Sequence, residues 1–446
     1  MKITLILPAG PIHRYKTGNF DKVLRYAPLT LTSLASMIPA DVEPEITIID
    51  DGVEILPGKY DADIVGISIM TGTSIRGYKI ANKIRKSGIP VIMGGVHCTL
   101  MPEEAALHAD AVVSGFGEDV FSELLHDFKS GKMKKFYKGD NDRVDLANRP
   151  WPRRDLLKKG AYITKNSIQA VRGCPNECEF CVIPVAWGKK SYYRPVGDVI
   201  RELEMFPGKI VTFVDPSPIE KPEYSKELYR AMIPLKKWWG GLATIKIAED
   251  DELLDLAVKS GCKGLLIGFE SVTQETLNSM HKTFNNANKF VEIVKKLHDK
   301  GIGIQGTFVF GFETDDTDVF KRTVDFVNKV KIDLPRFSAY TPFPGTPTYK
   351  NLDSQGRLLS KNWLLYDAQH VVFKPAKMSP KQLQEGLWWA WKQAYSPGSI
   401  VHRLFLRNRI EPVVMLPLNL GYRHYAMTLH EYNQVMYDKE AGMELT

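Results

Sequence analysis

The feature that most constrains the fold of this chain is an alternation of short apolar runs with amphipathic stretches, which occurs twice along its length. In residues 1 to about 130, the apolar runs include ITLILP, EITIID, DIVGISI, PVIMGG and DAVVSGFG, with helical patterns between them. This order predicts parallel strands joined by crossover helices, a doubly wound α/β domain whose ligands bind at the carboxyl ends of the strands. A second alternation begins at Ile168 and includes KIVTFVDPSP, GGLATIKIAED and IGIQGTFVFGFETDD.

Small and hydroxyl residues follow four of the predicted strands in the first domain. Such residues let a backbone approach a large flat ligand, and they offer hydrogen bonds to its amides and phosphate. One glycine-rich strand end is weak evidence, because turns in any parallel sheet use glycine. Four such ends in one domain favour a binding edge. The residues are Pro8 and Gly10; Thr71, Gly72, Thr73 and Ser74; Gly94, Gly95, Val96 and His97; and Gly115, Gly117 and Glu118.

Three of the five cysteines lie within eight residues, as Cys174, Cys178 and Cys181 in the run VRGCPNECEFC. Spacers of three and two residues allow the thiolates to close around one metal centre, and three thiolates leave one iron of a [4Fe–4S] cluster open to a small molecule. A zinc site needs a fourth ligand, which the flanking segment lacks, and three cysteines serve a disulfide badly. Cys98 and Cys262 lie in apolar contexts and are predicted to be small buried residues.

The Cys-x3-Cys-x2-Cys loop, with Phe180 before the third cysteine, resembles the signature of the radical S-adenosylmethionine (SAM) enzymes. The resemblance implies a [4Fe–4S] cluster whose free iron binds SAM, and an electron that cleaves SAM to a 5′-deoxyadenosyl radical. It also implies a partial (β/α)6 barrel. Glu270 could instead be an acid at a helix start and Gly311 a turn residue. By resemblance, the SAM-binding residues are Phe180, Asp215, Ser217, Thr244, Glu270, Ser271, Gln305, Phe310 and Gly311.

The runs VIMGGVHCTLMPEEA and ADAVVSGFGEDVF resemble the Rossmann-like cobalamin-binding domain that precedes the radical module in one branch of this family. This resemblance implies that the four strand ends, together with Thr99 and Pro102, contact cobalamin. The segment after EITIID reads DGVEILPG, without the Asp-x-His-x-x-Gly loop that places a histidine on cobalt in cobalamin domains of the methionine-synthase type. We therefore expect no histidine on cobalt, and His97 as a contact to the corrin or the nucleotide tail.

The domains are predicted as a cobalamin-binding domain at residues 1–135, a basic, proline-containing linker at 136–165, the radical SAM barrel at 166–358 and a small, mainly helical C-terminal domain at 359–446. In the last of these, a Ser-Pro pair opens a Trp-rich amphipathic run that we expect to pack against the barrel mouth. Tyr340, Tyr366 and His370 are the candidate catalytic residues, for substrate contact or proton transfer.

Composition narrows the setting in which the protein acts. The net charge of +7 is modest for 446 residues and is scattered among acids, so nucleic acid is not an expected partner. No apolar run reaches a membrane-spanning length, and the N-terminus lacks a secretory cleavage site, so we expect a cytoplasmic enzyme without membrane insertion. The resemblance implies an electron donor such as ferredoxin or flavodoxin.

Together these features predict a cobalamin-dependent radical SAM C-methyltransferase that acts on an unactivated carbon of a small molecule or a protein, such as a glutamine of methyl-coenzyme M reductase. One alternative is a non-methylating relative, such as an oxidative cyclase acting on a porphyrin. A corrinoid carrier or sensor is a second, although it has no use for a cluster with an open iron. An RNA methylthiolating enzyme is disfavoured, because such relatives carry three further cysteines in the first domain, where this chain has Cys98.

Overall fold

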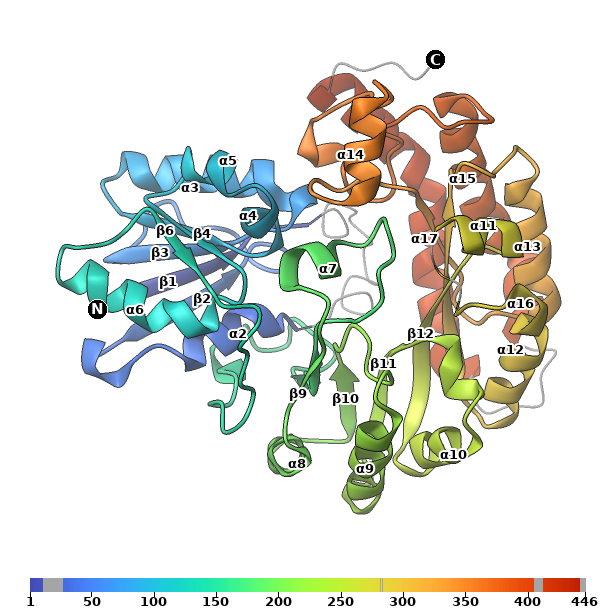
Figure 1. Ribbon diagram of the computed structural model, residues 1–446, viewed down its shortest axis with the longest axis horizontal. Helices are drawn as coiled ribbons and strands as arrows, with labels where there is room; N and C mark the ends of the chain where they lie inside the picture. The colour runs from blue at the N-terminus through green and yellow to red at the C-terminus, as the bar shows by residue number, and fades with distance from the viewer. Residues whose placement is uncertain (11–26, 281, 283, 405–411, 442–446) are drawn as a thin grey trace.

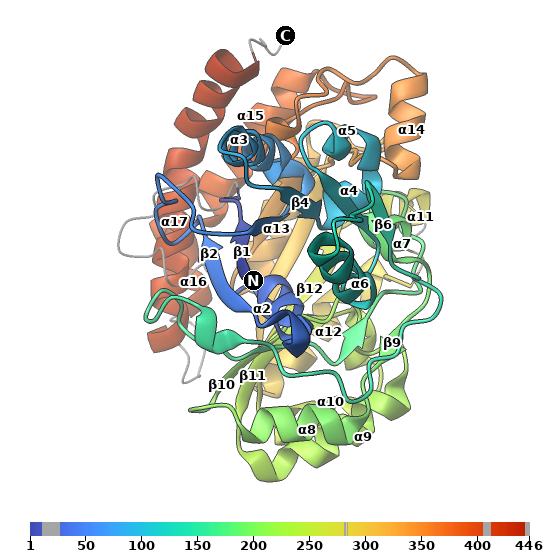
Figure 2. The ribbon, with the colours of Figure 1, turned by 90° about the vertical axis from the view of Figure 1, so that its left-hand side faces the viewer.

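The computed structural model describes residues 1–10, 27–280, 282, 284–404 and 412–441. Two parallel sheets lie side by side, and helices of the C-terminal part cover the second sheet (Figure 1). After a 90° turn, the first sheet lies in front of the second (Figure 2). No helix in the described part of the chain is long and apolar enough to cross a membrane.

The first sheet has six parallel strands in the order β2-β1-β3-β4-β5-β6. Alternate residues of its strands point to opposite faces, so that Leu5 packs among α2 and α6 while Ile6 packs among α3, α4 and α5. The predicted doubly wound domain is therefore confirmed. The strands are β1 (Lys2–Leu7), β2 (Glu45–Asp50), β3 (Ile64–Ser68), β4 (Val91–Gly94), β5 (Ala111–Ser114) and β6 (Phe136–Lys138); the helices are α2 (Leu29–Ser36), α3 (Ser74–Lys86), α4 (Val96–Leu100), α5 (Pro102–Ala106) and α6 (Glu118–Lys129).

The second sheet also has six parallel strands, in the order β14-β13-β12-β11-β10-β7. Its first and last strands do not pair, so the barrel is partial, as predicted. The strands are β7 (Ser167–Ile168), β10 (Ile210–Phe213), β11 (Trp238–Ala243), β12 (Cys262–Glu270), β13 (Gly303–Phe310) and β14 (Arg336–Ala339). The helices are α8 (Val196–Glu204), α9 (Pro222–Met232), α10 (Asp251–Lys259), α11 (Gln274–Ser279), α12 (Phe290–Asp299) and α13 (Val319–Val330).

Short elements join these parts. An antiparallel ribbon of β8 (Val171–Arg172) and β9 (Tyr192–Tyr193) flanks α7 (Val182–Trp187), which lies between the two sheets (Figure 1). The 3-10 turns are η2 (Ala40–Val42), η3 (Thr71–Thr73), η4 (Arg154–Leu156), η5 (Ile233–Leu235), η6 (Ile245–Ala248), η7 (Ala287–Lys289) and η8 (Trp363–Leu365).

The C-terminal part is helical, as predicted, with α14 (Pro347–Ser354), α15 (Pro380–Ala394), α16 (Pro397–Leu404), α17 (Pro412–Val435) and a π-helical turn, η9 (Met436–Ala441). The Trp-rich run forms α15, which begins with a capping box between Ser379 and Gln382. Trp391 is buried and donates its indole N–H to the carbonyl of Phe337 at 3.1 Å. Gly386 lets the helix approach Phe320 of α13. The helix therefore covers β14, the last strand of the sheet, and its Leu383 lies against Gly311 at the carboxyl end of β13.

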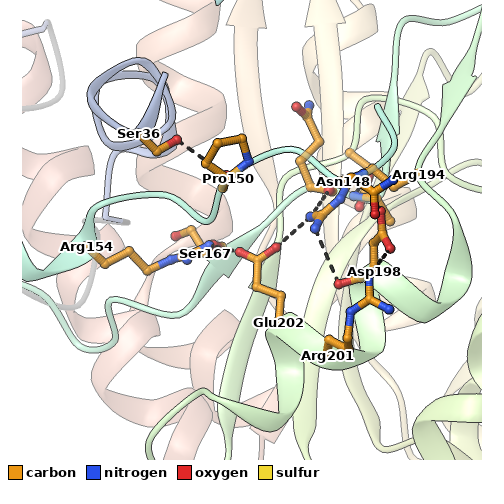
Figure 3. Close-up of polar contacts among 12 residues, drawn as sticks. Ser36, Asn148, Pro150, Arg154, Ser167, Arg194, Asp198, Arg201 and Glu202 are labelled. Carbon is orange, nitrogen blue, oxygen red and sulfur yellow. Dashed lines mark hydrogen bonds and ion pairs between the residues drawn. The ribbon is translucent and has the colours of Figure 1, made fainter. Parts of the chain in front are cut away.

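Residues 148–154, which we call the connector, run between the two domains and form polar contacts with helices of both (Figure 3). Ser36 of α2 donates to the carbonyl of Pro150 at 3.3 Å, and Asp198 of α8 accepts the N–H of Asn148 at 2.7 Å. Further along, Arg154 pairs with Glu202 of α8, whose side chain is 2% exposed. The connector thus fixes the first domain to the side of the barrel next to β7.

Candidate active site

The loop that carries the three cysteines is anchored at its start by Asp215. This buried carboxylate follows β10, and its Oδ1 accepts the N–H of Ala170 at 2.7 Å and the N–H of Val171. Burial raises the pKa of Asp215 to about 7, although the backbone N–H groups oppose the shift. Its Oδ2 has no hydrogen-bond partner among the described residues. Asp215 therefore shapes the loop through one oxygen and leaves the other uncommitted.

Backbone geometry then turns the loop into α7. Gly173 has a φ of +77°, and a Cβ there would lie 2.0 Å from the carbonyl oxygen of Lys190, so this position requires glycine. At the other end, Cys181 is the N-cap of α7, and its N–H donates to the carbonyl of Cys178 at 3.0 Å. A backbone hydrogen bond therefore joins two of the three cysteines at the start of one helix.

All five cysteines are free thiols, and the three in the loop are partly exposed while Cys98 and Cys262 are buried, as predicted. In the described part of the chain, no three His, Cys, Asp or Glu side chains converge closely enough to hold one metal ion. Cysteines that each bind a different iron of a cubane lie farther apart than ligands on one zinc ion. Burial raises the pKa of Cys181 to about 11, so metal binding there must release a proton.

A chain of polar contacts begins at the first cysteine. Asn176 donates from its Nδ2 to the Sγ of Cys174 at 3.4 Å and to Oε1 of Glu220 at 3.1 Å. Ser217 donates to the same Oε1 at 2.9 Å, and Lys246 of η6 donates to Oε2 of Glu220 at 3.0 Å. A buried carboxylate thus connects the cluster loop to the loops that follow β10 and β11.

A second buried pair lies at the end of β12. Lys282 is 6% exposed and donates from Nζ to Oε1 of Glu270 at 2.6 Å and to the carbonyl of Gly268 at 3.0 Å. Glu270 has a φ of +63°, an uncommon conformation for a residue other than glycine. Burial raises the pKa of Cys178, and the ammonium of Lys282 lies near enough to oppose that shift. This ammonium therefore belongs to the surroundings of the cluster.

Aromatic rings form an apolar side of the same region. Phe180 lies edge-on to Phe312 at 6.3 Å and to Tyr340 at 6.1 Å between ring centroids. The hydroxyl of Tyr340 bonds to Oγ1 of Thr348 at 2.6 Å. Of the three candidate catalytic residues, Tyr340 is therefore the one whose ring lies beside the cluster loop.

The other predicted SAM-binding residues fall into two groups. Thr244 caps η6 with its Oγ1 buried and without a partner among the described residues, and the Oγ of buried Ser271 accepts the N–H of Thr273 at 3.2 Å. By contrast, Phe310 packs against Phe320 of α13, and Gln305 donates to Tyr422 of α17 at 2.8 Å. Gly311 has a φ of +104° and donates its N–H to Asp315 at 3.0 Å. The side chains of Phe310 and Gln305 are thus engaged with helices, while Gly311 precedes Phe312, whose ring contacts Phe180 of the cysteine loop.

The described residues fit SAM at this position. Its methionine part carries an ammonium and a carboxylate, its sugar carries two hydroxyl groups, and each needs a polar partner once it is buried. The loops around the cysteines present carboxylates on Glu220 and Glu270, ammonium groups on Lys246 and Lys282, and the uncommitted hydroxyl of Thr244. This donor set matches a zwitterion with a diol.

The strand ends of the first sheet combine close-packed glycine backbone with small hydroxyl side chains. Gly95 has a φ of +99°, and a Cβ there would lie 2.6 Å from the carbonyl oxygen of Ile69. Thr71, Thr73 and Ser74 follow β3 in the same edge, and all three are buried. Bare backbone and small hydroxyl residues suit a large corrin ring, so the residues present fit cobalamin.

His97 is buried beside this edge and is occupied on both ring nitrogens. Its Nδ1 lies 3.2 Å from Oγ1 of Thr71, and its Nε2 lies 3.4 Å from Glu104. Glu104 also accepts the indole N–H of Trp363, at 2.9 Å. Burial alone would raise the pKa of Glu104, but the hydrogen bonds from these side chains lower it overall. His97 is thus part of a network that joins the first sheet to η8.

Tyr366 and His370 lie in a separate buried cluster that includes η8. Tyr366 donates its hydroxyl to the carbonyl of Ser360 at 2.7 Å. His370 is fully buried, with Nδ1 at 2.9 Å from Asp367 and with Nε2 unpartnered among the described residues. The ring of Tyr437 lies 4.9 Å from His370. The geometry gives these two residues no contact with the cysteine loop.

A three-cysteine loop on a partial parallel barrel, next to a doubly wound domain whose strand ends carry glycines and hydroxyl residues, is typical of a radical SAM enzyme with a cobalamin-binding domain. Residues 168–327 match the radical SAM superfamily, and residues 27–125 match the B12 binding domain. The chain is 32% identical to bacteriochlorophyllide d C-12(1)-methyltransferase of Chlorobaculum tepidum, over 84% of each chain. It is 24% identical to the anaerobic magnesium-protoporphyrin IX monomethyl ester cyclase of Cereibacter sphaeroides, over 73% of this chain and 58% of the relative.

Among solved structures, the radical SAM methyltransferase TsrM of Kitasatospora setae has the same fold, with a TM-score of 0.71 and 16% identity over 99% of this chain and 100% of that one. This chain belongs to the family of cobalamin-dependent radical SAM methyltransferases. It is an enzyme that uses a [4Fe–4S] cluster, SAM and cobalamin.

Four polar residues near the cysteines carried no recognisable signal in the sequence. Asn176 lies inside the motif, at a position where the spacing requires no residue type. Glu220, Lys246 and Lys282 lie in separate loops and come together through the parallel order of β10, β11 and β12. A buried zwitterion needs charged partners, so the charged residues in the segments after β10, β11 and β12 are the one sequence signal that points to them.

Replacing Cys174, Cys178 or Cys181 by Ala should abolish cluster assembly and SAM cleavage, because each thiolate holds a different iron. Iron, sulfide and 5′-deoxyadenosine assays on anaerobically reconstituted protein measure this. Cys98→Ala and Cys262→Ala are matched controls, since both residues are buried away from the loop, and they should retain about four irons. Normal iron content in any one of the loop variants would contradict the assignment.

His97→Ala should leave the electron paramagnetic resonance of the cob(II)alamin form unchanged, because both ring nitrogens of His97 already have protein partners. The measurement compares the axial nitrogen superhyperfine splitting of wild type and variant. Splitting that is present in wild type and lost in the variant would make His97 the axial ligand.

Proposed function

We propose that this enzyme transfers a methyl group to an unactivated carbon of its substrate. The supporting observation is that the cluster loop and the carboxyl-end loops of the first sheet contact each other directly. Arg172, two residues before the first cysteine, pairs with Glu118, which opens α6. Asn141 donates to the carbonyl of Ala186 in α7 at 2.9 Å. When bound, the cluster and SAM supply hydrogen abstraction, and cobalamin supplies the methyl group.

In this proposal, the loops after β10, β11 and β12 bind SAM. The carboxylate of Glu220 and the hydroxyl of Ser217 are placed for its ammonium group, and Lys246 for its carboxylate. Glu270 and Ser271 are placed for the ribose. Phe180 excludes water from the cluster side of the site, since its ring is packed among other aromatic rings. Thr244 offers a further hydrogen bond from a buried hydroxyl.

The four strand ends of residues 1–135 bind cobalamin in this proposal, without an imidazole on cobalt; Glu118 is left out of this set, because its carboxylate is paired with Arg172. We propose domain limits of 166–358 for the barrel and 359–446 for the C-terminal domain. The linker was expected at 136–165, but residues 136–138 form β6 of the first sheet, so the proposed linker begins after Lys138. A small redox protein such as ferredoxin or flavodoxin is the proposed electron donor.

For the substrate, we propose a large, apolar ring system with an aliphatic side chain, with a tetrapyrrole as the first candidate. Three relatives are named for reactions on tetrapyrroles, and one of them is 32% identical over 84% of each chain. The aromatic rings of Phe180, Phe312 and Tyr340 offer an apolar surface beside the cluster loop. The comparisons give no support to a glutamine of methyl-coenzyme M reductase, and we do not propose it.

Oxidative cyclisation of a tetrapyrrole is the second candidate, since a relative over 73% of this chain is named as a cyclase. Tyr340 is the proposed residue for substrate contact in either reaction. His370, with its carboxylate-bound ring and free Nε2, is a candidate for proton transfer if the substrate reaches the cluster around η8.

Methyl transfer should yield S-adenosylhomocysteine, 5′-deoxyadenosine and methylated product in about equal amounts, because one molecule of SAM donates the methyl group and another is cleaved. The assay supplies methyl-labelled SAM, a reductant and a tetrapyrrole with an aliphatic side chain, and quantifies all three products. Deoxyadenosine with an oxidised, unmethylated product would favour the cyclase. Neither nucleoside under reducing conditions would contradict both reactions.

Glu220→Gln should weaken SAM binding about 10- to 100-fold, since a hydrogen bond to a charged group contributes about 1.5–3 kcal/mol. Isothermal titration of the reconstituted protein measures the Kd. Glu249→Gln is the matched control, because Glu249 forms an exposed pair with Lys289 at 3.3 Å. An unchanged Kd in Glu220→Gln, with a complete cluster, would remove Glu220 from the binding site.

A further inference from the structure

The turn between β5 and α6 lies against the segment that flanks the three cysteines. Its last residue, Glu118, forms an ion pair with Arg172, and both side chains are 15% exposed. Arg172 lies two residues before Cys174, and its Nε donates to Gln169 at 2.9 Å. An edge of the cobalamin-binding sheet is therefore attached to the start of the cluster loop by two largely buried charges.

The same turn also contacts the end of the cluster loop through Phe116. The ring of Phe116 is stacked on Trp187 at 6.1 Å with an interplanar angle of 13°, and the guanidinium of Arg172 lies 5.5 Å from the same ring. Trp187 is the last residue of α7, and Cys181 caps the start of that helix. Phe116 therefore touches the residues on both sides of the cysteines.

A third contact runs through Asn141, in the segment after β6. Its Oδ1 accepts the N–H of Phe116 at 3.1 Å, and its Nδ2 donates to the carbonyl of Ala186 at 2.9 Å. Two glycines make this approach possible. A Cβ on Gly139 would lie 2.1 Å from the carbonyl oxygen of Phe116, and one on Gly115 would lie 2.7 Å from Oδ1 of Asn141.

Hydrogen bonds continue from this turn into the proposed cobalamin edge. Gly115 donates its N–H to Oγ1 of Thr99 at 2.9 Å, and this hydroxyl donates to the carbonyl of Gly95 at 3.2 Å. A continuous path of short contacts thus leads from the end of β4, through the turn, to α7. Its parts are backbone and short side chains, which have little freedom to adjust.

We propose that Glu118, Phe116, Asn141 and Arg172 form a clasp that fixes the distance and orientation between the cobalamin edge and the cluster loop. The four are positioning residues, and the proposal rests on the proposed function, which places the two cofactors at these loops. A methyl donor and a radical source must meet the same carbon, and a misplacement of about 1 Å costs such a reaction about 100-fold in rate. An ion pair of this kind contributes more to geometry than to stability.

The test uses the full chain with both cofactors and compares Glu118→Gln, Arg172→Gln and the double variant. Pulsed dipolar electron paramagnetic resonance between cob(II)alamin and the reduced cluster gives the distribution of distances between them. If the clasp exists, all three variants should keep wild-type contents of iron, sulfide and cobalt. The distribution of distances between cob(II)alamin and the cluster should be broader than in wild type. The kcat should fall about 10- to 100-fold, with a small change in KM for SAM. The double variant should have a distance distribution no broader, and a kcat no lower, than either single variant, because both substitutions remove the same contact.

Arg154→Gln is the matched control. It also removes a partner of a buried carboxylate between the connector and the barrel, since Arg154 pairs with Glu202 of α8 (Figure 3). Glu202 keeps Arg194 as a second partner at 2.6 Å. This variant should show the wild-type distance distribution, because neither residue touches a cysteine loop or a strand end of the first sheet.

A wild-type distribution in Glu118→Gln and Arg172→Gln would overturn the clasp. Loss of cobalamin in Glu118→Gln alone would also overturn it, because Glu118 would then be a cobalamin contact. If either variant fails to fold, Asn141→Ser, which removes the amide contact and keeps the ion pair, must broaden the distribution for the proposal to stand. A narrow wild-type distribution in a protein that forms no methylated product would refute the proposed function and leave the clasp intact.

Discussion

Parallel strand pairing is the constraint on which the rest of this structure depends. In a parallel sheet, every loop that follows a strand lies at the same edge, so residues far apart in sequence meet there. Here two such sheets lie side by side, and the loops at their carboxyl ends touch through Glu118 and Arg172 and through Asn141 and Ala186. The loops of both sheets are thereby brought to one interface.

The fold and the centre of the site could be predicted because their signals are local. Alternating apolar and amphipathic runs fix strand and helix, and three cysteines within one loop fix the cluster position. The strand ends of the first domain were visible for the same reason, since Gly95 and Gly115 stand where the backbone needs a positive φ. Each of these features is set by residues within a few positions of one another.

The remainder of the site depends on contacts between distant segments. Glu104 and Trp363 are separated by 259 residues, and Lys282 approaches Cys178 only through the order of the strands. Barrel strands are buried on both faces, so their sequence does not show which residues face the interior. In β12, Phe269 packs against Phe290 of α12 while Glu270, one residue later, turns to Lys282. In β13, the family resemblance placed Phe310 among the SAM-binding residues, and the ring of Phe310 packs against Phe320 of α13.

Buried charges around the cysteines explain how a stable barrel can hold such a site. Glu220 with Lys246, Glu270 with Lys282 and Glu118 with Arg172 each satisfy one charge with another, so none of these six side chains is left as an isolated ion. Such pairs add little net stability, because desolvation offsets their attraction. These pairs instead fix the orientation of the carboxylates, since a carboxylate held by a lysine or arginine keeps its remaining lone pairs at a fixed position. In the proposed function, a zwitterionic ligand exchanges partners with the first two pairs, and in the proposed clasp the third pair holds the two domains in register.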